Sequence, residues 1–244
     1  MILTYVLLVV GFVLLIKGAD FFVEASSSIA KTLRVPSIII GLTIVAFGTS
    51  MPELAVSTTA SLAGNNEIAV GNVIGSNIFN LLVVLGACGA IRPFAVQLRW
   101  DYAASVGVAA ALFFMIVGDH FVSRTEAIIL LMLFAFFVAM TVRDALTNRI
   151  EEEEEYKSIT PLRCAIYIVG GLTAIVCGGD LVVECAKEIA LALGMSQTLV
   201  GLTVVALGTS LPELVTSVVA SRKGENGLAL GNVIGSNIFN MMFV

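Results

Sequence analysis

"GLTIVAFGTSMPEL", at residues 41–54, returns almost letter for letter as GLTVVALGTSLPEL at residues 201–214. A second stretch, GNVIGSNIFN, occurs at residues 71–80 and again, unchanged, at residues 231–240. Both pairs are 160 residues apart. Two motifs that keep one register over such a distance indicate an internal duplication.

The sequence around these motifs is strongly apolar. Hydrophobic residues make up 58% of the chain and charged residues only 13%, and the mean hydropathy is +1.02. Soluble domains carry about 25% charged residues, and apolar runs of about 20 residues are typical of membrane-spanning helices. We therefore predict an all-α polytopic membrane protein. Its expected surroundings are the lipid bilayer; nothing indicates nucleic-acid binding or identifies a protein partner.

Eight apolar segments are predicted to span the membrane. A polar stretch with five consecutive glutamates separates the fifth from the sixth. We therefore divide the chain into a first repeat half (1–146), an acidic loop (147–161) and a second repeat half (162–244). The predicted spans are 2–19, 37–62, 68–90, 100–118, 125–146, 162–180, 197–221 and 227 to the last residue.

Basic residues in the loops predict the orientation of these spans. Ten lie on the side of the first connection and only Arg124 and Lys187 on the other. Because basic loops stay in the cytoplasm, the N-terminus is expected outside the cell membrane and the acidic loop inside. The ten are Lys31, Arg34, Arg92, Arg99, Arg143, Arg149, Lys157, Arg163, Arg222 and Lys223.

Five predicted spans separate equivalent points of the two copies. Because five is odd, the second copy enters the membrane from the opposite side, and inverted repeats of this kind are typical of secondary transporters. A second copy of five spans needs two more after the eighth. We therefore expect inverted-topology repeats of five helices, the second of them truncated.

A proline interrupts each copy of the first motif. Pro52 lacks an N–H and its ring collides with the carbonyl of Gly48, while Met51 is pushed away from helical angles. The helix is therefore expected to break across residues 48–52, and Pro212 repeats the argument in the second copy. Carbonyl groups freed inside a membrane are tolerated where protein, water or ions satisfy them, so the break suits a cation.

Oxygen-bearing side chains gather around each break. Thr49, Ser50 and Glu53 share one helical face, and Ser76 and Asn80 lie four apart on the next segment. None is Cys or His, which argues against zinc or copper and favours Ca²⁺ or Na⁺. The set has enough oxygens for one Ca²⁺ or for several Na⁺. The second copy supplies Thr209, Ser210, Glu213, Ser236 and Asn240.

The charge of the two glutamates requires a counter-charge. No lysine or arginine lies near Glu53 or Glu213 within the predicted spans. Two neighbouring carboxylates stay ionised only if a divalent cation or several monovalent cations bind; otherwise a proton does. Competition among these ions suits an exchanger, although a passive cation channel would use the same path. No pattern supports an enzyme.

Other repeated residues are predicted to have structural roles. Asn77 and Asn237 are expected to form hydrogen bonds between helices, and Asn72 and Asn232 to cap helices. The pairs Gly71/Gly75 and Gly231/Gly235 are expected to allow close helix packing. Asp20 and Asp180 are expected to serve as caps or loop residues at the ends of spans.

The motifs GTSMPEL and GTSLPEL, each followed by GNVIGSNIFN, resemble the paired alpha repeats of the cation/calcium exchanger superfamily, in its sodium/calcium exchanger branch. The resemblance spans nearly all of this chain, although the family usually has ten spans. It implies antiport of Na⁺ against Ca²⁺ by alternating access, with several Na⁺ exchanged per Ca²⁺ and no cofactor.

The resemblance also implies a ligand set. Glu53 and Glu213 would be the central acidic ligands, with Asn80 and Asn240 beside them at the centre. Many relatives carry aspartate where this sequence has Asn240, which weakens any expectation of K⁺ cotransport and leaves protons as an alternative to Na⁺. Gly-Thr-Ser before the glutamate favours Na⁺. The implied flanking Na⁺ ligands are Thr49, Ser50, Ser76, Thr209, Ser210, Ser236 and the backbone oxygens of Ala46 and Ala206.

Overall fold

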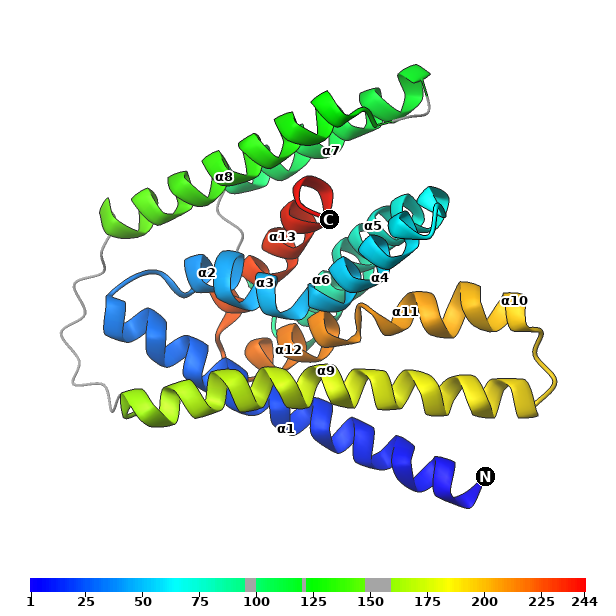
Figure 1. The fold of residues 1–244 in the computed structure, drawn as a ribbon. Helices are drawn as coiled ribbons and strands as arrows, with labels where there is room; N and C mark the ends of the chain where they lie inside the picture. Colours follow the sequence, from blue (N-terminus) through cyan, green and yellow to red (C-terminus); the bar gives the residue numbers. More distant parts are fainter. Residues whose placement is uncertain (95–99, 120–121, 148–158) are drawn as a thin grey trace.

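The computed structural model describes residues 1–94, 100–119, 122–147 and 159–244, and within these ranges the chain is helical without strands (Figure 1). Residues 148–158, which hold the five glutamates of the predicted acidic loop, lie outside this description. The elements are α1 (Ile2–Leu33), α2 (Ser37–Ile40), η1 (Gly41–Val45), α3 (Ala46–Thr49), α4 (Met51–Leu62), α5 (Asn66–Phe79), η2 (Asn80–Val84), α6 (Leu85–Ile91), α7 (Trp100–Asp119), α8 (Arg124–Thr147), α9 (Pro161–Ala192), α10 (Gln197–Val200), η3 (Gly201–Val205), α11 (Ala206–Gly208), α12 (Leu211–Arg222) and α13 (Asn226–Met242).

These elements cover all eight predicted spans. Within the described residues, α1, α5–α6, α8 and α9 are long and apolar enough to cross a membrane, and the bent pair of 37–49 and 51–62 makes a fifth such segment. The three labelled η are short π-helical turns that join α-helical pieces of one span. The prediction of an all-helical membrane protein is therefore confirmed.

The first and sixth spans are longer than predicted. Both α1 and α9 contain 32 residues, about 48 Å of helix at 1.5 Å per residue, which exceeds a hydrocarbon core of about 30 Å. Asp20 and Asp180 therefore lie inside helices, and their assignment to caps or loops was wrong. The Asp20 carboxylate is compensated by Lys17, one turn away, and by Lys223 at 3.2 Å.

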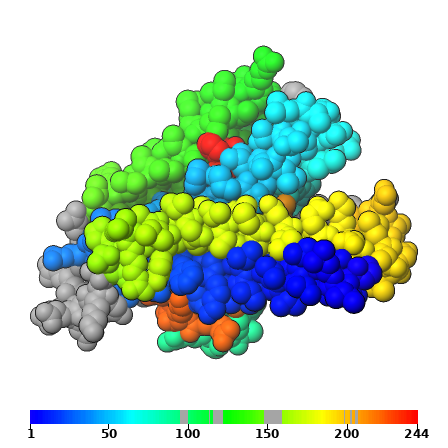
Figure 2. Space-filling view, turned by 60° about the horizontal axis from the view of Figure 1, so that its bottom comes forward, coloured from blue at the N-terminus to red at the C-terminus, as the bar shows by residue number. Residues whose placement is uncertain are grey.

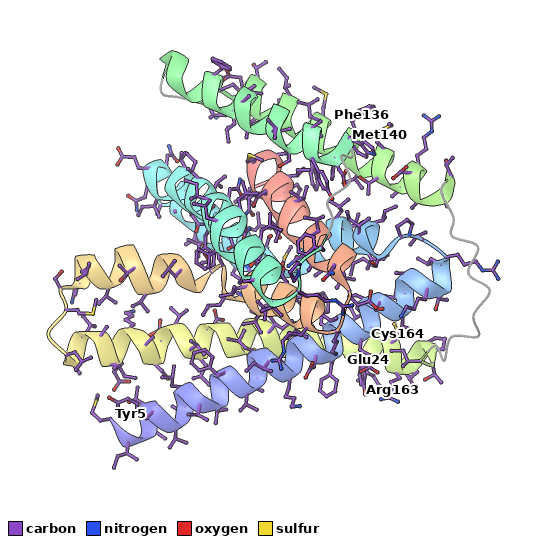
Figure 3. The ribbon with its side chains drawn as sticks, turned by 180° about the vertical axis from the view of Figure 1, so that it is seen from behind. Tyr5, Glu24, Phe136, Met140, Arg163 and Cys164 are labelled. Atoms are coloured by element: carbon purple, nitrogen blue, oxygen red, sulfur yellow. The ribbon has the colours of Figure 1, made fainter. Side chains whose placement is uncertain are left out.

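Helices α1 and α9, the equivalent first helices of the two repeats, lie side by side along one face of the molecule (Figures 1 and 2). Their backbones touch where glycines meet. A Cβ atom on Gly18 would lie 2.8 Å from the carbonyl oxygen of Gly171, and one on Gly171 would lie 2.8 Å from that of Gly18. Near one end of the pair, Arg163 reaches Glu24 at 4.0 Å (Figure 3).

The distribution of polarity suits a bilayer. Apolar side chains face outward, among them Ile2, Leu82 and Phe136, which are 85%, 72% and 63% exposed, whereas Glu53 and Glu213 are fully buried. Figure 3 shows Phe136 on the outer helix α8. In water such exposure would oppose folding, but lipid accepts apolar surface and excludes polar groups. The polar side chains are therefore collected at the centre of the molecule.

The hairpin α7–α8 covers one side of α13 (Figure 1). Phe134 of α8 contacts Phe239 of α13 with ring centres 5.7 Å apart. On another side, α13 packs against α2 and η1, where a Cβ atom on Gly235 would lie 2.6 Å from the carbonyl oxygen of Leu42. The predicted packing role of Gly231 and Gly235 is thereby confirmed. Around Gly71 and Gly75 of α5, no described atom comes within 4 Å of such a Cβ.

The turn between α12 and α13 is tied to α1. Lys223 donates a hydrogen bond to the backbone oxygen of Asp20 at 2.7 Å, in addition to their ion pair. Glu225 accepts from Lys31 at 3.4 Å and from Ser27. At the equivalent positions of the first repeat, the turn carries Ala63 and Asn65 instead of Lys and Glu.

Candidate cation site

The two helix breaks position the site. Helix α3 ends at Thr49, Ser50 leaves the helical region (φ −85°, ψ 9°) and α4 begins at Met51, with a bend of 47°. Ser210 has nearly the same angles (φ −91°, ψ 5°) before α12. The break is confirmed, but Met51 is helical, contrary to prediction, because a proline is tolerated in the first turn of a new helix. The non-helical residue is Ser50.

Glu53 and Glu213 lie in the first turns of α4 and α12 and face each other's repeat. Ser50 donates to Glu213 Oε1 at 2.8 Å, and Ser210 donates to Glu53 Oε1 at 3.2 Å. Ser76 reaches the same oxygen of Glu53 at 3.5 Å. Ser236 repeats this contact on Glu213 at 3.4 Å. Each carboxylate is therefore held by one hydroxyl from each repeat, and the two acids share one centre.

Six buried side-chain oxygens remain without a hydrogen-bond partner among the described residues, and four of them belong to this site. They occur in symmetric pairs: Oε2 of Glu53 and of Glu213, and Oδ1 of Asn80 and of Asn240. An unpartnered buried acceptor costs about 1–3 kcal/mol, and more when it is charged. In the described part of the chain, no lysine or arginine forms an ion pair with either carboxylate, and no cluster of three His, Cys, Asp or Glu exists. Buried oxygens of this kind are the ligands that hard cations prefer.

Asn77 and Asn237 hold the side-chain amides of Asn80 and Asn240 in place at the centre of the site. Asn77 and Asn237 donate to each other's backbone oxygens, both at 3.3 Å, which confirms their predicted role between helices. Asn80 Nδ2 donates to Asn237 Oδ1 at 3.1 Å, and Asn240 Nδ2 donates to Asn77 Oδ1 at 3.4 Å. Because the Nδ2 groups are engaged, the Oδ1 atoms of Asn80 and Asn240 stay available to a cation.

The threonines occupy the flanks. Thr49 is buried and donates to Asn232 Oδ1 at 3.0 Å, with the backbone oxygen of Ala46 as a second acceptor at 3.5 Å. The same oxygen of Ala46 accepts the backbone N–H of Ser50. Thr209 is partly exposed and donates to Asn72 Oδ1 at 3.4 Å. Ala206 begins α11, the short helix that ends at Gly208, one residue before this threonine.

The prediction that Asn72 and Asn232 cap helices was wrong. Helices α5 and α13 begin at residues 66 and 226, so both asparagines lie more than one turn inside. Each amide bridges the repeats: it accepts from a threonine of the other repeat and donates to Ser57 or Ser217 of its own, at 2.9 and 2.8 Å. Their identical place in the duplicated motif was the available signal, because polar residues kept in both copies of a membrane span are candidates for a shared role.

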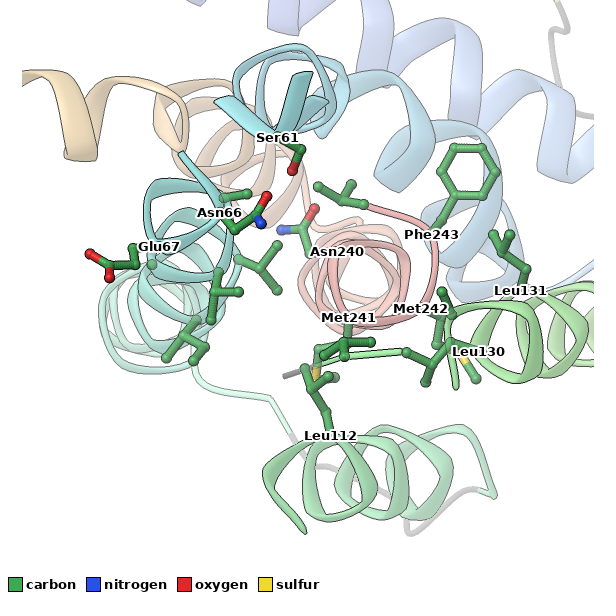
Figure 4. Close-up of a pocket in the computed structure, with 18 residues that line it drawn as sticks. Ser61, Asn66, Glu67, Leu112, Leu130, Leu131, Asn240, Met241, Met242 and Phe243 are labelled. Atoms are coloured by element: carbon green, nitrogen blue, oxygen red, sulfur yellow. The ribbon is translucent and has the colours of Figure 1, made fainter. Parts of the chain in front are cut away.

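A pocket of about 760 Å³ reaches this centre between α5, the α7–α8 hairpin and the end of α13 (Figure 4). Its lining is mainly apolar, with Leu112, Leu130 and Met241 among the residues shown. Asn240 contributes to the lining, whereas the carboxylate of Glu67 points away from the space between the helices (Figure 4). Among the described residues, the pocket therefore extends from the surface near α5 to one of the central amides.

Comparisons with known proteins match the whole chain. The family model described as sodium/calcium exchanger protein matches residues 3–143 and 164–244. Sodium/calcium exchanger MaX1 of Methanosarcina acetivorans is 33% identical and covers 98% of this chain, which spans 81% of that protein. Inner membrane protein YrbG of Escherichia coli is 37% identical over 100% of this chain and 79% of its own length. A solved structure of the sodium-calcium exchanger NCX_Mj, soaked with Na⁺ and Ca²⁺, is 36% identical with a TM-score of 0.85, over 98% of this chain and 79% of that one.

Proposed function

The chain belongs to the sodium/calcium exchanger protein family, whose members are membrane transporters and not enzymes, and we propose that it exchanges Na⁺ for Ca²⁺ by alternating access. The ions would bind at the site built by Glu53, Glu213 and their hydroxyl and amide neighbours. Both ions are substrates, and the proposal includes no cofactor.

The observation that carries this proposal is the symmetric set of four buried, unpartnered oxygens on Glu53, Glu213, Asn80 and Asn240. Two ionised carboxylates balance the charge of one Ca²⁺, which takes six to eight oxygen ligands in flexible geometry. Two Na⁺ ions balance the same charge when Ca²⁺ leaves. One site that requires cations but accepts either kind is what coupled exchange needs.

The flanking groups support Na⁺ as the counter-ion. Thr49, Thr209 and the backbone oxygen of Ala46 are uncharged oxygen ligands beside the carboxylates. Hard cations bind such oxygens, and a monovalent ion needs less negative charge around it than Ca²⁺ does. The inverted repeats support alternating access, because a site on the axis between them is offered to either side by equivalent movements. The distribution of basic loop residues supports an outside N-terminus and a cytoplasmic acidic loop in the cell membrane.

The test is Ca²⁺ uptake by proteoliposomes that contain the full chain, with outward gradients of Na⁺, K⁺ and H⁺ imposed separately. We expect only the Na⁺ gradient to drive accumulation of Ca²⁺ above its external concentration. Drive by a proton gradient would replace Na⁺ with H⁺ as the counter-ion. Ca²⁺ flux that equilibrates without any counter-ion gradient would indicate a passive channel.

Glu53→Gln and Glu213→Gln test the site itself. Each removes one of the two charges that hold Ca²⁺, so we expect either substitution to abolish Ca²⁺ uptake. Glu67→Gln is the matched control, because that carboxylate is exposed in the same repeat as Glu53. Uptake at the unmodified level in both site variants would remove the glutamates from the proposal.

A further inference from the structure

Asn72 and Asn232 are each held at both ends of the amide. Asn232 is fully buried, accepts from Thr49 at 3.0 Å and donates to Ser217 at 2.8 Å. Asn72 accepts from Thr209 at 3.4 Å and donates to Ser57 at 2.9 Å. Neither asparagine contacts a carboxylate side chain through a hydrogen bond in the described structure. Asn72 also donates to the backbone oxygen of Glu53 at 3.3 Å, whereas Asn232 reaches the site, in the described contacts, only through Thr49 and its own helix.

The direction of the threonine hydrogen bond matters for a cation. A hydroxyl has one proton to donate and two lone pairs to accept with, and only the lone pairs bind a cation. Because Asn232 Oδ1 takes the proton of Thr49, the lone pairs of that hydroxyl are free for an ion. The Ser217 hydroxyl holds the amide from the other end, which opposes a flip that would present Nδ2 to the threonine.

Without Asn232, the Thr49 hydroxyl would donate its proton to a different acceptor. The other acceptors within reach are the carboxylate of Glu213 and the backbone oxygen of Ala46, the latter at 3.5 Å. Both belong to the proposed cation ligands, so a hydrogen bond to either would occupy two ligand groups at once. The asparagine therefore keeps the Thr49 hydroxyl from taking up another ligand on this flank of the site.

We propose that Asn72 and Asn232 are positioning residues that orient the hydroxyls of Thr209 and Thr49 toward bound Na⁺ and so set the Na⁺ dependence of exchange. This inference rests on the proposed function and adds the residues that tune one of its two substrates. The central carboxylates, which carry the charge that Ca²⁺ requires, are not touched by either amide side chain in the described contacts.

The two positions differ in burial. Asn232 and Thr49 are both fully buried, whereas Asn72 and Thr209 are partly exposed. Water can replace a lost partner at an exposed position but not at a buried one. Substitution of Asn232 is therefore the stronger test, and substitution of Asn72 is expected to have the same direction with a smaller size.

The experiment measures exchange by the full chain in proteoliposomes at varied Na⁺ and varied Ca²⁺. For Asn232→Ala we expect the Na⁺ concentration that gives half-maximal exchange to rise about tenfold, as the loss of one hydrogen bond of about 1.4 kcal/mol implies. The half-maximal Ca²⁺ concentration should change less than about twofold. Asn65→Ala, an exposed asparagine one residue before α5, is the matched control and should change neither.

A double-mutant cycle separates positioning from mere support of the fold. If Asn232 acts through Thr49, the Asn232→Ala/Thr49→Val double variant should show the same Na⁺ dependence as Thr49→Val alone. Effects that add, or parallel losses for Na⁺ and Ca²⁺, would overturn the inference. An unmodified protein that ignores Na⁺ would instead refute the proposed function, so the two failures are distinguishable.

Stabilisation by ions against thermal unfolding is a second measurement, for a variant whose transport is too slow to analyse. Ions that bind the folded protein raise its melting temperature, and at a given concentration they raise it more when they bind more tightly. In detergent, Asn232→Ala should lose most of the stabilisation by NaCl, measured against choline chloride, but keep that by CaCl₂. If Asn232→Ala fails to fold, Asn72→Ala with Thr209→Val repeats the cycle on the more exposed flank. Retention of the full Na⁺ response in a folded variant would contradict the proposal.

Discussion

The ten residues GNVIGSNIFN stand in two different surroundings. At 231–240 every one of them is buried in α13, between η1 and the α7–α8 hairpin. At 71–80, in α5 and the start of η2, only Val73, Ser76, Asn77 and Asn80 are buried. The polar residues thus face the centre in both copies, whereas the described residues cover the opposite face in one copy alone. The shared sequence specifies the site, and the neighbouring helices decide how much else of the helix is enclosed.

The glycines should give the largest contrast between the copies. A Cβ atom at Gly231 would lie 2.2 Å from the backbone oxygen of Ile38, whereas Gly71 has open space around it. We expect Gly231→Ala to destabilise the fold by about 3 kcal/mol, because overpacking against backbone forces the helices apart. Gly71→Ala should instead stabilise this 244-residue chain by about 0.5–1 kcal/mol, since alanine favours the helix. Thermal unfolding in detergent measures both, and equal responses would contradict the difference in packing.

The serines should behave alike in both copies. Ser76→Ala and Ser236→Ala each remove one hydroxyl from one carboxylate, at 3.5 and 3.4 Å. A hydrogen bond to a charged group contributes about 1.5 kcal/mol or more, so we expect the half-maximal Ca²⁺ concentration to rise roughly tenfold in either variant. Ser61→Ala, an exposed hydroxyl of α4, is the control. A large effect of only one serine would show that the two helices are not equivalent at the site.

The smallest effect is expected at the ion pair between Lys223 of the α12–α13 turn and Asp20 of α1, because the equivalent turn of the first repeat has Ala63 in place of the lysine. Asp20→Asn removes the ion pair with Lys223, and Asp180→Asn is the matched change in the other repeat. Because the pair is partly exposed, we expect a loss of at most about 1 kcal/mol for Asp20→Asn and less for Asp180→Asn. Thermal unfolding is measured at low and high choline chloride, which avoids the substrate Na⁺. The stability difference between Asp20→Asn and the unmodified chain should shrink at high salt, because salt screens the ion pair. A salt-independent loss would argue for packing instead.

Much of the fold followed from the sequence because the chain repeats itself. Hydropathy located the spans, and the proline located each helix break to within one residue. The length of α1 escaped prediction because Asp20 ended the apolar run, although the helix continues through it to Leu33. Pairing between helices is also absent from a hydropathy pattern, so no expectation distinguished the enclosed α13 from the half-open α5.

The site residues could also be predicted because the sequence is duplicated. Glu53 and Glu213 stood out because an acid inside an apolar span requires a partner. Asn72 and Asn232 were assigned to helix ends because the predicted spans began at 68 and 227, close to them in sequence. The helices start at 66 and 226, and only the crossing of the repeats brings each amide to a threonine 137 or 183 residues away.

The tie between the α12–α13 turn and α1 breaks the symmetry of the molecule. A carrier with two identical halves would rest equally in its inward-open and outward-open forms. Lys223 and Glu225 bind α1 on one side only, since their counterparts are Ala63 and Asn65. A contact of about 1 kcal/mol that survives in just one form shifts such a balance to about five to one. The resting carrier would then offer its empty site mainly to one face of the membrane, and the two faces would differ in the ion concentrations that start a cycle.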